Sequence, residues 1–474
     1  MSADWAQAPP TLSDVLAARE SRAFRQRLAL QQANTSCVVS VTLVVPGPDK
    51  RPPWTAPVFD EADRVVREAI AAGGWGHTWE EVRRAAPIGP EALWGLTTDP
   101  CQVKAALVAA EDGHPIGRLW DLDVVVPSGP LSRAELGLPV RSCLACAEPA
   151  AGCARSRRHD VAALLAVARA LVGRWELSRA TPYAAAAHAA LLAELHHTPK
   201  PGLVDLRNTG AHDDMDVPLF EASAEAIVGA LGQCETLGEL AGASASPAAL
   251  PRLLAQLRPV GLAAEARMLD ATGGVNTHRG AIFAFGLLCA AAGYLRGAGR
   301  PVTVAAVGET VARIAAPTLA ELTVLAELSG GRGREASHGL AAHTAYGMRG
   351  ARGEAASGYA TVRDRALPAY RRVVNASGDQ SAALAQALLE LLAAHDDTNL
   401  AARGGRTGVA LVRRRATELL AAGGALAPGF REAMERFDDE LIAARLSPGG
   451  TADLLGVTIF LAGLAGFDGL DAPD

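Results

Sequence analysis

Acidic, basic and amide side chains concentrate in one short segment near the middle of the chain, residues 198–216 (TPKPGLVDLRNTGAHDDMD). The polar residues of this segment are Lys200, Asp205, Asn208, His212, Asp213, Asp214 and Asp216. Magnesium takes hard oxygen ligands and commonly links carboxylates to substrate phosphates. The segment therefore predicts a magnesium and phosphate site, with Asp205, His212 and Asp214 as catalytic candidates. The predicted magnesium ligands are Asp213, Asp214 and Asp216, and Lys200 and Asn208 are predicted to bind substrate. The alternative is an acid-rich first turn of a helix, where carboxylates complement the helix dipole.

A second polar segment, residues 272–281 (TGGVNTHRGA), precedes an apolar stretch typical of a buried helix. Glycine allows close backbone approach, and the N-terminus of a helix favours an anion. Asn276, His278 and Arg279 are therefore predicted to bind substrate there. An ordinary capped loop is the alternative.

A third segment, residues 395–406 (HDDTNLAARGGR), places acids at the end of an apolar helical pattern. Two acid clusters that border apolar helices make a metal site inside a helical bundle plausible. The predicted magnesium ligands here are Asp396, Asp397 and Thr398, and Asp397 is also a catalytic candidate. The predicted substrate-binding residues are Asn399, Arg403, Gly404 and Gly405.

Two glycine-rich segments complete this set. Residues 346–358 (YGMRGARGEAASG) carry Arg349, Arg352 and Glu354, which suit either a phosphate-binding loop or a flexible connection. Residues 447–453 (SPGGTAD) carry Ser447, Gly449, Gly450 and Asp453, which suit substrate binding or simple capping of the final helix.

In the first third of the chain, the informative segment is residues 117–126 (GRLWDLDVVV). Alternate residues of a strand point to the same face, so Asp121 and Asp123 project together. Such a pair can hold magnesium for in-line attack on phosphorus, or can face solvent as an acidic pair on an edge strand. Arg19, Arg22, Lys50 and Arg118 are predicted to bind substrate. Arg19, Arg22 and Arg25 lie three apart on one helix face, and a solvated basic face explains these three arginines equally well.

Residues 141–159 contain a spaced set of thiols and one imidazole, Cys143, Cys146, Cys153 and His159. Zinc accepts three thiolates and one imidazole, so zinc binding is one interpretation. Reduced cysteines packed beside a basic helix start are the other.

Two kinds of element must position these residues. Up to about residue 180 the pattern predicts α+β structure, with strands over 37–45 and 119–126 and helices over 12–32, 57–72, 100–111 and 160–177. Asp99 and Pro100 predict a capped helix start. Beyond residue 180 the pattern predicts an all-α domain, with helices over 182–196, 215–234, 279–295, 302–328, 381–394 and 408–422 and a loop over 241–250. The predicted domains are therefore residues 1–180 and 181–474.

Bulk composition excludes several classes. Hydrophobic residues make up 49% of the 474 residues, and the formal net charge of −6 leaves no basic footprint for nucleic acid. Residues 1–10 show no signal-peptide pattern, and the apolar runs 281–295 and 454–467 are shorter than the roughly 20 residues that span a bilayer. We expect a cytoplasmic protein without a membrane or nucleic-acid partner.

The segments beyond residue 183 together resemble the triphosphoribosyl-dephospho-CoA synthase family. The resemblance rests on the sequence motifs TPKPGLVD, GVNTH, RGARGEA, DDTNL and SPGG. This resemblance implies that ATP donates its triphosphoribosyl group to 3'-dephospho-CoA and that adenine is released. The triphosphate would then be neutralised by magnesium and by Lys200, Arg279, Arg349, Arg352 and Arg403. Ala401 and Ala402 depart from the family, which often carries an aromatic or histidine pair there.

Residues 16–175 resemble the citrate lyase holo-acyl-carrier-protein synthase family through VVPGP, GHPIGRLWDLDV and the cysteine segment. The resemblance implies transfer of phosphoribosyl-dephospho-CoA to a serine of the citrate lyase acyl carrier protein, with release of pyrophosphate. Residues 51–54 (RPPW) depart from the family, where a short polar stretch is expected.

The two resemblances describe consecutive reactions and predict a bifunctional transferase. Two alternatives stay open, a magnesium-dependent all-α hydrolase of N-glycosidic bonds and a non-catalytic carrier-binding module. The carrier of malonate decarboxylase is an alternative protein partner, although the first third of the chain favours citrate lyase.

Overall fold

The computed structural model describes residues 10–244, 246, 248–329 and 338–464. Its contacts divide the chain into two compact units, Met1–Ser178 and Arg179–Asp474. The prediction that no signal peptide is present concerns residues 1–10, of which 1–9 lie outside the described residues. The last three residues of the apolar run 454–467 also lie outside them.

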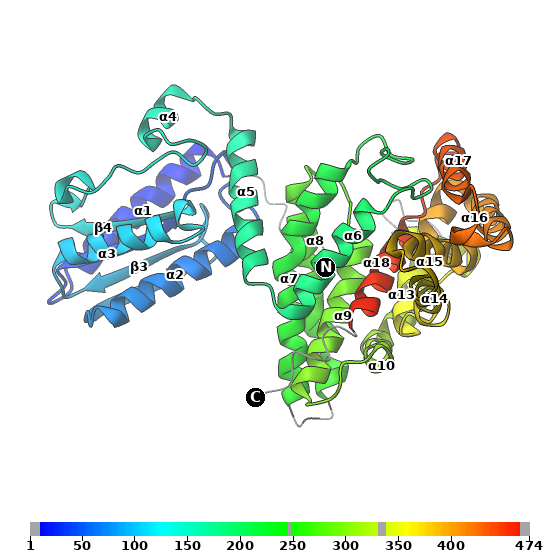
Figure 1. The fold of residues 1–474 in the computed structure, drawn as a ribbon. Coiled ribbons are helices and arrows are strands. Elements are labelled where there is room, and N and C mark those ends of the chain that lie inside the picture. Colours follow the sequence, from blue (N-terminus) through cyan, green and yellow to red (C-terminus); the bar gives the residue numbers. More distant parts are fainter. Residues whose placement is uncertain (1–9, 245, 247, 330–337, 465–474) are drawn as a thin grey trace. The chain divides into compact units, whose positions relative to one another are not determined.

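The N-terminal unit contains a five-stranded antiparallel sheet (Figure 1). Its strands, in the spatial order β2-β3-β1-β4-β5, are β2 His77–Arg83, β3 Glu91–Leu96, β1 Cys37–Leu43, β4 Trp120–Val126 and β5 Gly129–Pro130. The pattern of residue types predicted β1 and β4. It missed β2, which is largely polar and exposed, and β3, which is buried along its whole length and so shows no alternation.

Five helices accompany the sheet, namely α1 Leu12–Leu30, α2 Thr55–Ala72, α3 Pro100–Gly113, α4 Ala150–Ser156 and α5 Val161–Ser178. The predicted start of α3 is confirmed, because Pro100 occupies its first turn and the Asp99 side chain accepts a hydrogen bond from the Cys101 N–H. A side-chain acceptor at this position satisfies an amide that the helix leaves unpaired.

The two faces of the sheet have different chemistry. Trp120, Leu122 and Val124 of β4 are buried in one core with apolar residues of α2, α3 and α5. Strand periodicity sends Asp121 and Asp123 to the opposite face, beside Thr42 and Ser40 of β1. The carboxylate pair therefore lies outside the main core.

The C-terminal unit is helical, and its described residues contain no strand (Figure 1). Its helices are α6 Pro182–His196, α7 Val217–Ala243, α8 Ala249–Ala271, α9 Arg279–Gly297, α10 Val304–Ala315, α11 Pro317–Ser329, α12 His338–Tyr346, α13 Gly350–Ala356, α14 Leu367–Ser377, α15 Gln380–Ala394, α16 Thr398–Ala421, α17 Phe430–Ala443 and α18 Gly449–Gly463.

Two predicted boundaries in this unit are wrong. The single helix expected over 302–328 is divided into α10 and α11 at Ala316, because Pro317 has no N–H to continue the hydrogen-bond ladder. The loop expected over 241–250 is shorter, since α7 extends to Ala243 and the unpredicted α8 begins at Ala249.

Helices α7 and α9 approach each other through glycines. A Cβ atom at Gly238 or Gly242 of α7 would lie 2.0 Å from a carbonyl oxygen of α9. A Cβ atom at Gly293 or Gly297 of α9 would lie 2.1 Å from a carbonyl oxygen of α7. By length and composition α9 could cross a membrane, but 72% of its apolar window is buried within the protein, as in a core helix.

Candidate active sites

A cavity of about 1170 Å³ lies within the C-terminal unit. Its wall includes residues at the beginnings of α9, α16 and α18, three helices that are far apart in the sequence. Unpaired N–H groups and the helix dipole make each such end favourable for an anion. The fold thus brings together three of the predicted polar segments around one space.

Four arginines predicted to bind substrate line this cavity, namely Arg279, Arg349, Arg352 and Arg403. Arg279 pairs with Glu265 at 3.1 Å, and Arg403 donates to the Ala211 carbonyl at 3.0 Å. The Nη1 atom of Arg352 is buried without a hydrogen-bond partner among the described residues. The cavity wall can therefore neutralise a multiply charged anion.

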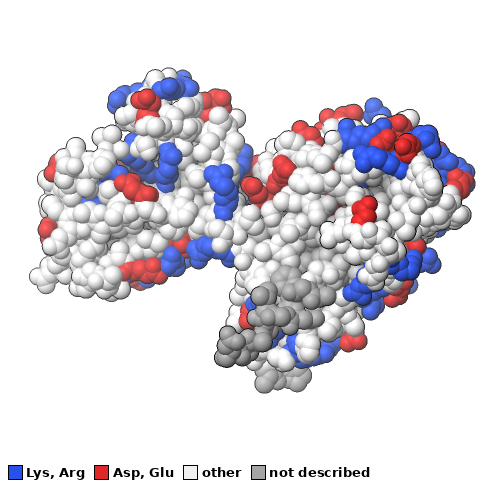
Figure 2. Space-filling view, viewed as in Figure 1, with Lys and Arg blue, Asp and Glu red and all other residues white. Residues whose placement is uncertain are grey.

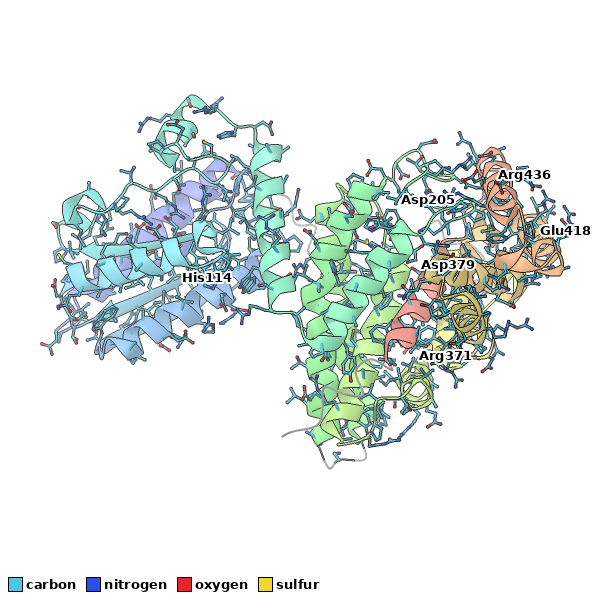
Figure 3. All side chains as sticks on the ribbon, in the orientation of Figure 1. His114, Asp205, Arg371, Asp379, Glu418 and Arg436 are labelled. Atoms are coloured by element: carbon cyan, nitrogen blue, oxygen red, sulfur yellow. The ribbon has the colours of Figure 1, made fainter. Side chains whose placement is uncertain are left out.

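The acid-rich segment 198–216 forms the loop between α6 and α7, and Figure 3 shows Asp205 in it. Asp205 is buried and accepts hydrogen bonds from the backbone N–H groups of Lys200, Arg207 and Asn208. The Asn208 side chain donates to Asp438 of α17 at 2.7 Å. These side chains do not line the cavity, so the geometry gives both residues a role in shaping the loop.

The three clustered acids of that loop separate in space. Asp214 lines the cavity, whereas Asp213 is highly exposed and lies 3.6 Å from Arg445. Asp216 caps α7 by accepting from the Leu219 N–H at 2.9 Å. One of the three, Asp214, is therefore placed to meet a ligand in the cavity.

Lys200 is almost completely buried in the cavity wall and donates to Glu194 of α6 at 2.6 Å. Burial raises the pKa of Glu194, although the positive charge of Lys200 opposes that shift. Sequence reasoning missed Glu194, because a single glutamate in an alanine-rich helix gives no pattern that separates it from a surface residue.

His212 joins two of the predicted segments. Its Nε2 lies 2.9 Å from the Ser447 hydroxyl, and its Nδ1 lies 3.2 Å from an Arg403 guanidinium nitrogen. Burial and the neighbouring Arg403 lower the pKa of His212. A neutral imidazole is consequently favoured at neutral pH.

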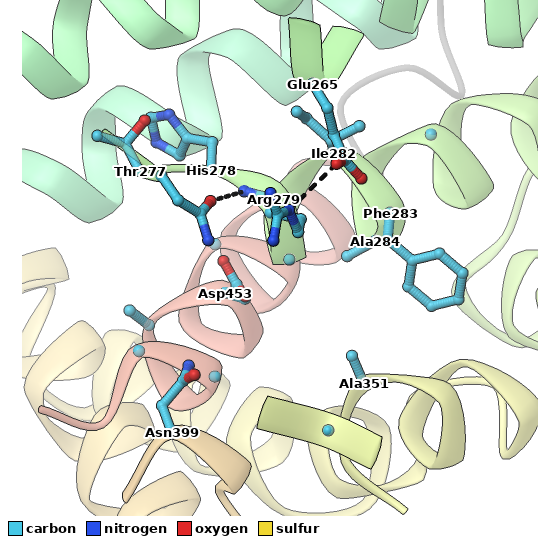
Figure 4. Close-up of a pocket in the computed structure, with 18 of the residues that line it drawn as sticks. Glu265, Thr277, His278, Arg279, Ile282, Phe283, Ala284, Ala351, Asn399 and Asp453 are labelled. Atoms are coloured by element: carbon cyan, nitrogen blue, oxygen red, sulfur yellow. Dashed lines mark hydrogen bonds and ion pairs between the residues drawn. The ribbon is translucent and has the colours of Figure 1, made fainter. Parts of the chain in front are cut away.

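Asp453 of α18 has the most unusual setting in the cavity. No described residue donates a hydrogen bond to its carboxylate, and Figure 4 shows it between Arg279 of α9 and Asn399 of α16. Burial, with repulsion from Glu194 and Asp397, raises the pKa of Asp453 well above the ordinary value. Its Oδ2 lies 2.0 Å from where a Cβ at Gly280 would stand, so this glycine leaves room for the carboxylate.

Asp397 has the opposite setting. It is fully buried and its carboxylate accepts from the N–H groups of Asn399, Leu400 and Thr451 and from the Thr451 hydroxyl. It therefore caps α16 and ties that helix to α18. Asp396 is exposed and pairs with Arg413 at 2.9 Å, while Thr398 and Asn399 line the cavity.

The remaining predicted residues divide between wall and support. Asn276 and His278 line the cavity, and the His278 Nδ1 lies 2.7 Å from the Ser223 hydroxyl. Burial, with repulsion from Lys200 and His188, lowers the pKa of His278 to about 3. Glu354 accepts from the Thr361 hydroxyl. Ser447, Gly449 and Gly450 line the cavity, and Gly404 and Gly405 lie in α16, which departs from helical geometry at Gly405.

A second candidate site lies in the N-terminal unit, on the sheet face that α1 partly covers. Asp121 lies 3.3 Å from Arg141 and 3.2 Å from the Thr42 hydroxyl. Asp123 lies 3.6 Å from Lys104 of α3. Burial and the neighbouring Asp121 raise the pKa of Asp123. The two carboxylates share one face, as the strand periodicity predicted.

The basic residues predicted for this site have mixed settings. Arg22 is held by Glu91 at 2.7 Å, and Arg19 is exposed. Burial, with repulsion from Arg19, lowers the pKa of Lys50, which donates to the Val45 carbonyl. The Nε and one Nη of Arg118 are buried without partners among the described residues. Arg118 thus has two buried donors that a ligand could use.

Comparison with known proteins matches both units to described families. Residues 180–470 match the ATP:dephospho-CoA triphosphoribosyl transferase family, and residues 10–175 match the apo-citrate lyase phosphoribosyl-dephospho-CoA transferase family. The first match covers more than half of the chain. The chain belongs to the ATP:dephospho-CoA triphosphoribosyl transferase family, and its residues 10–175 are similar to the second family.

Individual relatives carry the name of the synthase. The chain is 50% identical over 273 residues to 2-(5''-triphosphoribosyl)-3'-dephosphocoenzyme-A synthase of Klebsiella pneumoniae. The aligned region covers 58% of this chain and 87% of the relative. The chain is 45% identical to the protein of that name from Escherichia fergusonii, with 58% and 88% covered. A probable synthase from Salmonella typhimurium is 48% identical, with 58% and 87% covered.

Membership of the triphosphoribosyl transferase family identifies the chain as a transferase and concerns the unit that holds the cavity. The match also agrees with the polar segments from which the resemblance was inferred, since all of them lie within residues 180–470. The roles of individual residues remain predictions, which the geometry above makes more specific.

Proposed function

We propose that the C-terminal unit transfers the triphosphoribosyl group of ATP to the 2'-hydroxyl of 3'-dephospho-CoA and releases adenine. The N-terminal unit then transfers phosphoribosyl-dephospho-CoA to a serine of the citrate lyase acyl carrier protein and releases pyrophosphate. The observation that carries the first step is the unpaired Asp453 carboxylate among arginines and helix N-termini in one cavity. The relatives that carry the synthase name support the same assignment.

The anionic end of ATP is assigned to the arginine-lined wall. Arg279, Arg349 and Arg403 lie at or near the beginnings of α9, α13 and α16, where they can contact phosphate oxygens. Magnesium bound with the triphosphate would supply further charge neutralisation. Asp214 and Thr398 offer it hard oxygen ligands, in keeping with a magnesium ion held by few protein groups together with substrate phosphates.

Asp453 is assigned as the base for the acceptor hydroxyl. The ribose C1'' forms a bond to the acceptor 2'-oxygen as its bond to N9 of adenine breaks, and the hydroxyl proton passes to the carboxylate. A raised pKa makes Asp453 a stronger base than an ordinary aspartate. Its negative charge also stabilises the oxocarbenium character of the ribose. The departing adenine takes up a proton, and His395, whose Nε2 is buried without a partner in the described structure, can contact the purine.

The apolar portion of the cavity favours transfer to an organic acceptor over hydrolysis. Leu231, Leu254 and Leu287 line it, and its volume of about 1170 Å³ exceeds the roughly 300–1,000 Å³ of common ligand pockets. A hydrolase of N-glycosidic bonds needs room for one nucleotide and water. The larger space is suited to ATP and dephospho-CoA together.

For the second step, the Asp121 and Asp123 pair is assigned to the triphosphate of the intermediate, with magnesium. The carrier serine Oγ bonds to the α-phosphorus as the bond to the β-phosphate oxygen breaks, and the serine proton passes to a carboxylate. The raised pKa of Asp123 makes it the better acceptor. We place both reactions in the cytoplasm, where ATP and CoA precursors are found.

The test is incubation of the full chain with ATP, Mg²⁺ and 3'-dephospho-CoA, followed by chromatography for adenine and mass spectrometry of the nucleotide products. We expect adenine and triphosphoribosyl-dephospho-CoA in equal amounts, and added apo-carrier protein should gain the phosphoribosyl-dephospho-CoA mass. Adenine with free triphosphoribose would establish the hydrolase instead. If no ATP-dependent product forms, the non-catalytic carrier-binding module is the interpretation that remains.

A further inference from the structure

Four side chains of the N-terminal unit converge at a place that neither proposed reaction uses. One ligand atom from each of Cys143, Cys146, Cys153 and His159 lies within 4.8 Å of the other three. The Cys146 and Cys153 sulfurs are 3.6 Å apart, and the His159 Nε2 lies 3.3 Å from the Cys146 sulfur. Among the described residues this is the one group of three or more candidate metal ligands.

The backbone around the first two cysteines has the form of a metal-binding knuckle. Residues 141–150 fold into a tight hairpin, in which the Cys143 N–H donates to the Glu148 carbonyl at 2.7 Å and the Ala150 N–H donates to the Arg141 carbonyl at 2.9 Å. The turn therefore holds Cys143 and Cys146 close together, with their ligand atoms within 4.8 Å of each other.

The third and fourth ligands come from the next elements. Cys153 is buried in the short helix α4, and His159 follows it just before α5. The Asp160 side chain accepts from the Ala163 N–H at 2.7 Å and so holds the first turn of α5 beside His159. The ligand set therefore links a hairpin, α4 and the start of a core helix.

The distances suit a tetrahedral metal better than a disulfide. Sulfurs bound to zinc at about 2.3 Å lie roughly 3.8 Å apart, whereas a disulfide requires about 2.05 Å. Three thiolates, one imidazole and Zn²⁺ carry one net negative charge. The exposed Arg155, Arg157 and Arg158 lie in the same segment, and Figure 2 shows basic side chains gathered around α4.

The segment has few other means of staying folded. Between residues 127 and 160 the regular elements are the two-residue β5, one 3₁₀ turn at Ala134–Leu136 and the seven-residue α4. Yet Arg141, two residues before Cys143, reaches back to β4 and contacts the Asp121 carboxylate at 3.3 Å and the Arg118 carbonyl at 3.0 Å. A structural metal supplies folding free energy that so small a segment lacks.

We propose that Cys143, Cys146, Cys153 and His159 bind a structural zinc ion, which holds Arg141 against the carboxylate strand. With all four positions taken by protein, the ion is closed to substrate. Arg141 is consequently a positioning residue, fixed by the metal hairpin at one end and by Asp121 at the other.

The test is the zinc content of the full chain, purified under reducing conditions from zinc-supplemented cells, by plasma mass spectrometry. We expect one zinc ion per chain, and near-complete loss of it in Cys146→Ser and in His159→Ala. Cys101→Ser, which alters an exposed cysteine outside the group, should retain the ion. Cobalt exchanged into the site should give the thiolate-to-metal absorption of a tetrahedral sulfur-rich centre.

A second measurement serves if the cysteine variants fail to fold. Chelation of the unaltered chain should release zinc and accelerate tryptic cleavage after Arg155, Arg157 and Arg158, and added Zn²⁺ should reverse the acceleration. Three titratable thiols at Cys143, Cys146 and Cys153, with no bound metal in the reduced, folded chain, would overturn the proposal. A disulfide between Cys146 and Cys153, detected as a mass two hydrogens lower and located by peptide mapping, would also overturn it.

Discussion

The two carboxylate sites of this chain are built in different ways. Asp121 and Asp123 are two residues apart, and the alternation of one strand places them together on one face of the sheet. Around Asp453 the arginines and helix ends come from segments spread between Arg279 and Gly449, and they enclose a cavity. A local period thus creates one site, and tertiary packing creates the other.

The difference affects how each carboxylate behaves. Asp121 and Asp123 have cationic neighbours, Arg141 and Lys104, and about half of each side chain is exposed. Asp453 has no donor among the described residues and two acidic neighbours. An open, paired site suits docking of a carrier protein, whereas an enclosed, unpaired carboxylate suits proton abstraction from a small molecule.

The largest expected effect is at Asp453. Asp453→Asn should lower the rate of adenine release by roughly 10²- to 10⁴-fold, because the base for the acceptor hydroxyl is removed. Carrier labelling from ready-made triphosphoribosyl-dephospho-CoA should be unchanged. Glu418→Gln, an exposed substitution on α16, is the control and should retain adenine release. A near-normal rate in Asp453→Asn would move the base to another residue.

The complementary substitution is Asp123→Asn, which should reduce carrier labelling by about 10²-fold or more and leave adenine release intact. Triphosphoribosyl-dephospho-CoA should then accumulate, as measured by mass spectrometry. Asp112→Asn, which changes an exposed acid of the same unit, should label the carrier normally. Loss of adenine release in Asp123→Asn would show that the two sites are not separable.

A stability measurement separates Asp397 from its neighbour. Asp397→Ala should lower the free energy of unfolding of the C-terminal unit by about 2–3 kcal/mol, since it removes the acceptor of the α16 cap and of the tie to α18. Asp396→Ala alters an exposed side chain and should change it by under about 0.5 kcal/mol. Equal denaturation midpoints would return Asp397 to a mainly catalytic role.

A smaller effect is expected from the close contact at α9. Gly280→Ala should slow adenine release roughly 10-fold, because the new methyl group must displace the Asp453 carboxylate. The thermal midpoint should change little. Gly463→Ala, at the open end of α18, is the matched control and should have no effect on the rate. An unchanged rate in Gly280→Ala would indicate that the carboxylate position is not critical.

The smallest expected effect is a pH dependence of stability. The pKa of Asp453 is raised in the folded chain, so the folded state binds more protons than the unfolded state above the ordinary carboxyl pKa of about 3.9. The contribution of Asp453 to stability therefore decreases as pH rises through its folded pKa. As pH rises from about 5 to 8, the free energy of unfolding of Asp453→Asn should increase relative to that of the unaltered chain. A constant difference would argue against a raised pKa.

Sequence reasoning succeeded where one element contains the signal. The ends of α6 at Pro182 and His196 follow from a proline start and an alanine-rich pattern, and the Asp121 and Asp123 pair follows from β4 alone. It failed where packing decides. Strand β3 is buried on both faces and so lacks the alternation of apolar and polar residues that marks a strand. Helix α8 was not predicted, because Pro259 interrupts its helical pattern.

The candidate site shows the same division. The polar segments around the cavity were identified by composition, but composition does not separate a capping aspartate from an unpaired one. Asp397 and Asp453 both stand near the start of an apolar helix, and only the donors around each carboxylate distinguish them. Glu194 and Asp438 act through partners on other elements, Lys200 and Asn208, and no local pattern indicates them.

The glycine seam between α7 and α9 has a consequence for mutational tolerance. Gly238, Gly242, Gly293 and Gly297 do not line the cavity, yet each methyl group added there would meet a carbonyl of the opposing helix. Saturation mutagenesis should therefore find these four positions as intolerant as the arginines of the cavity, for a reason unrelated to catalysis. Activity screens alone would misassign them as functional, and a parallel screen for protein abundance would separate the two classes.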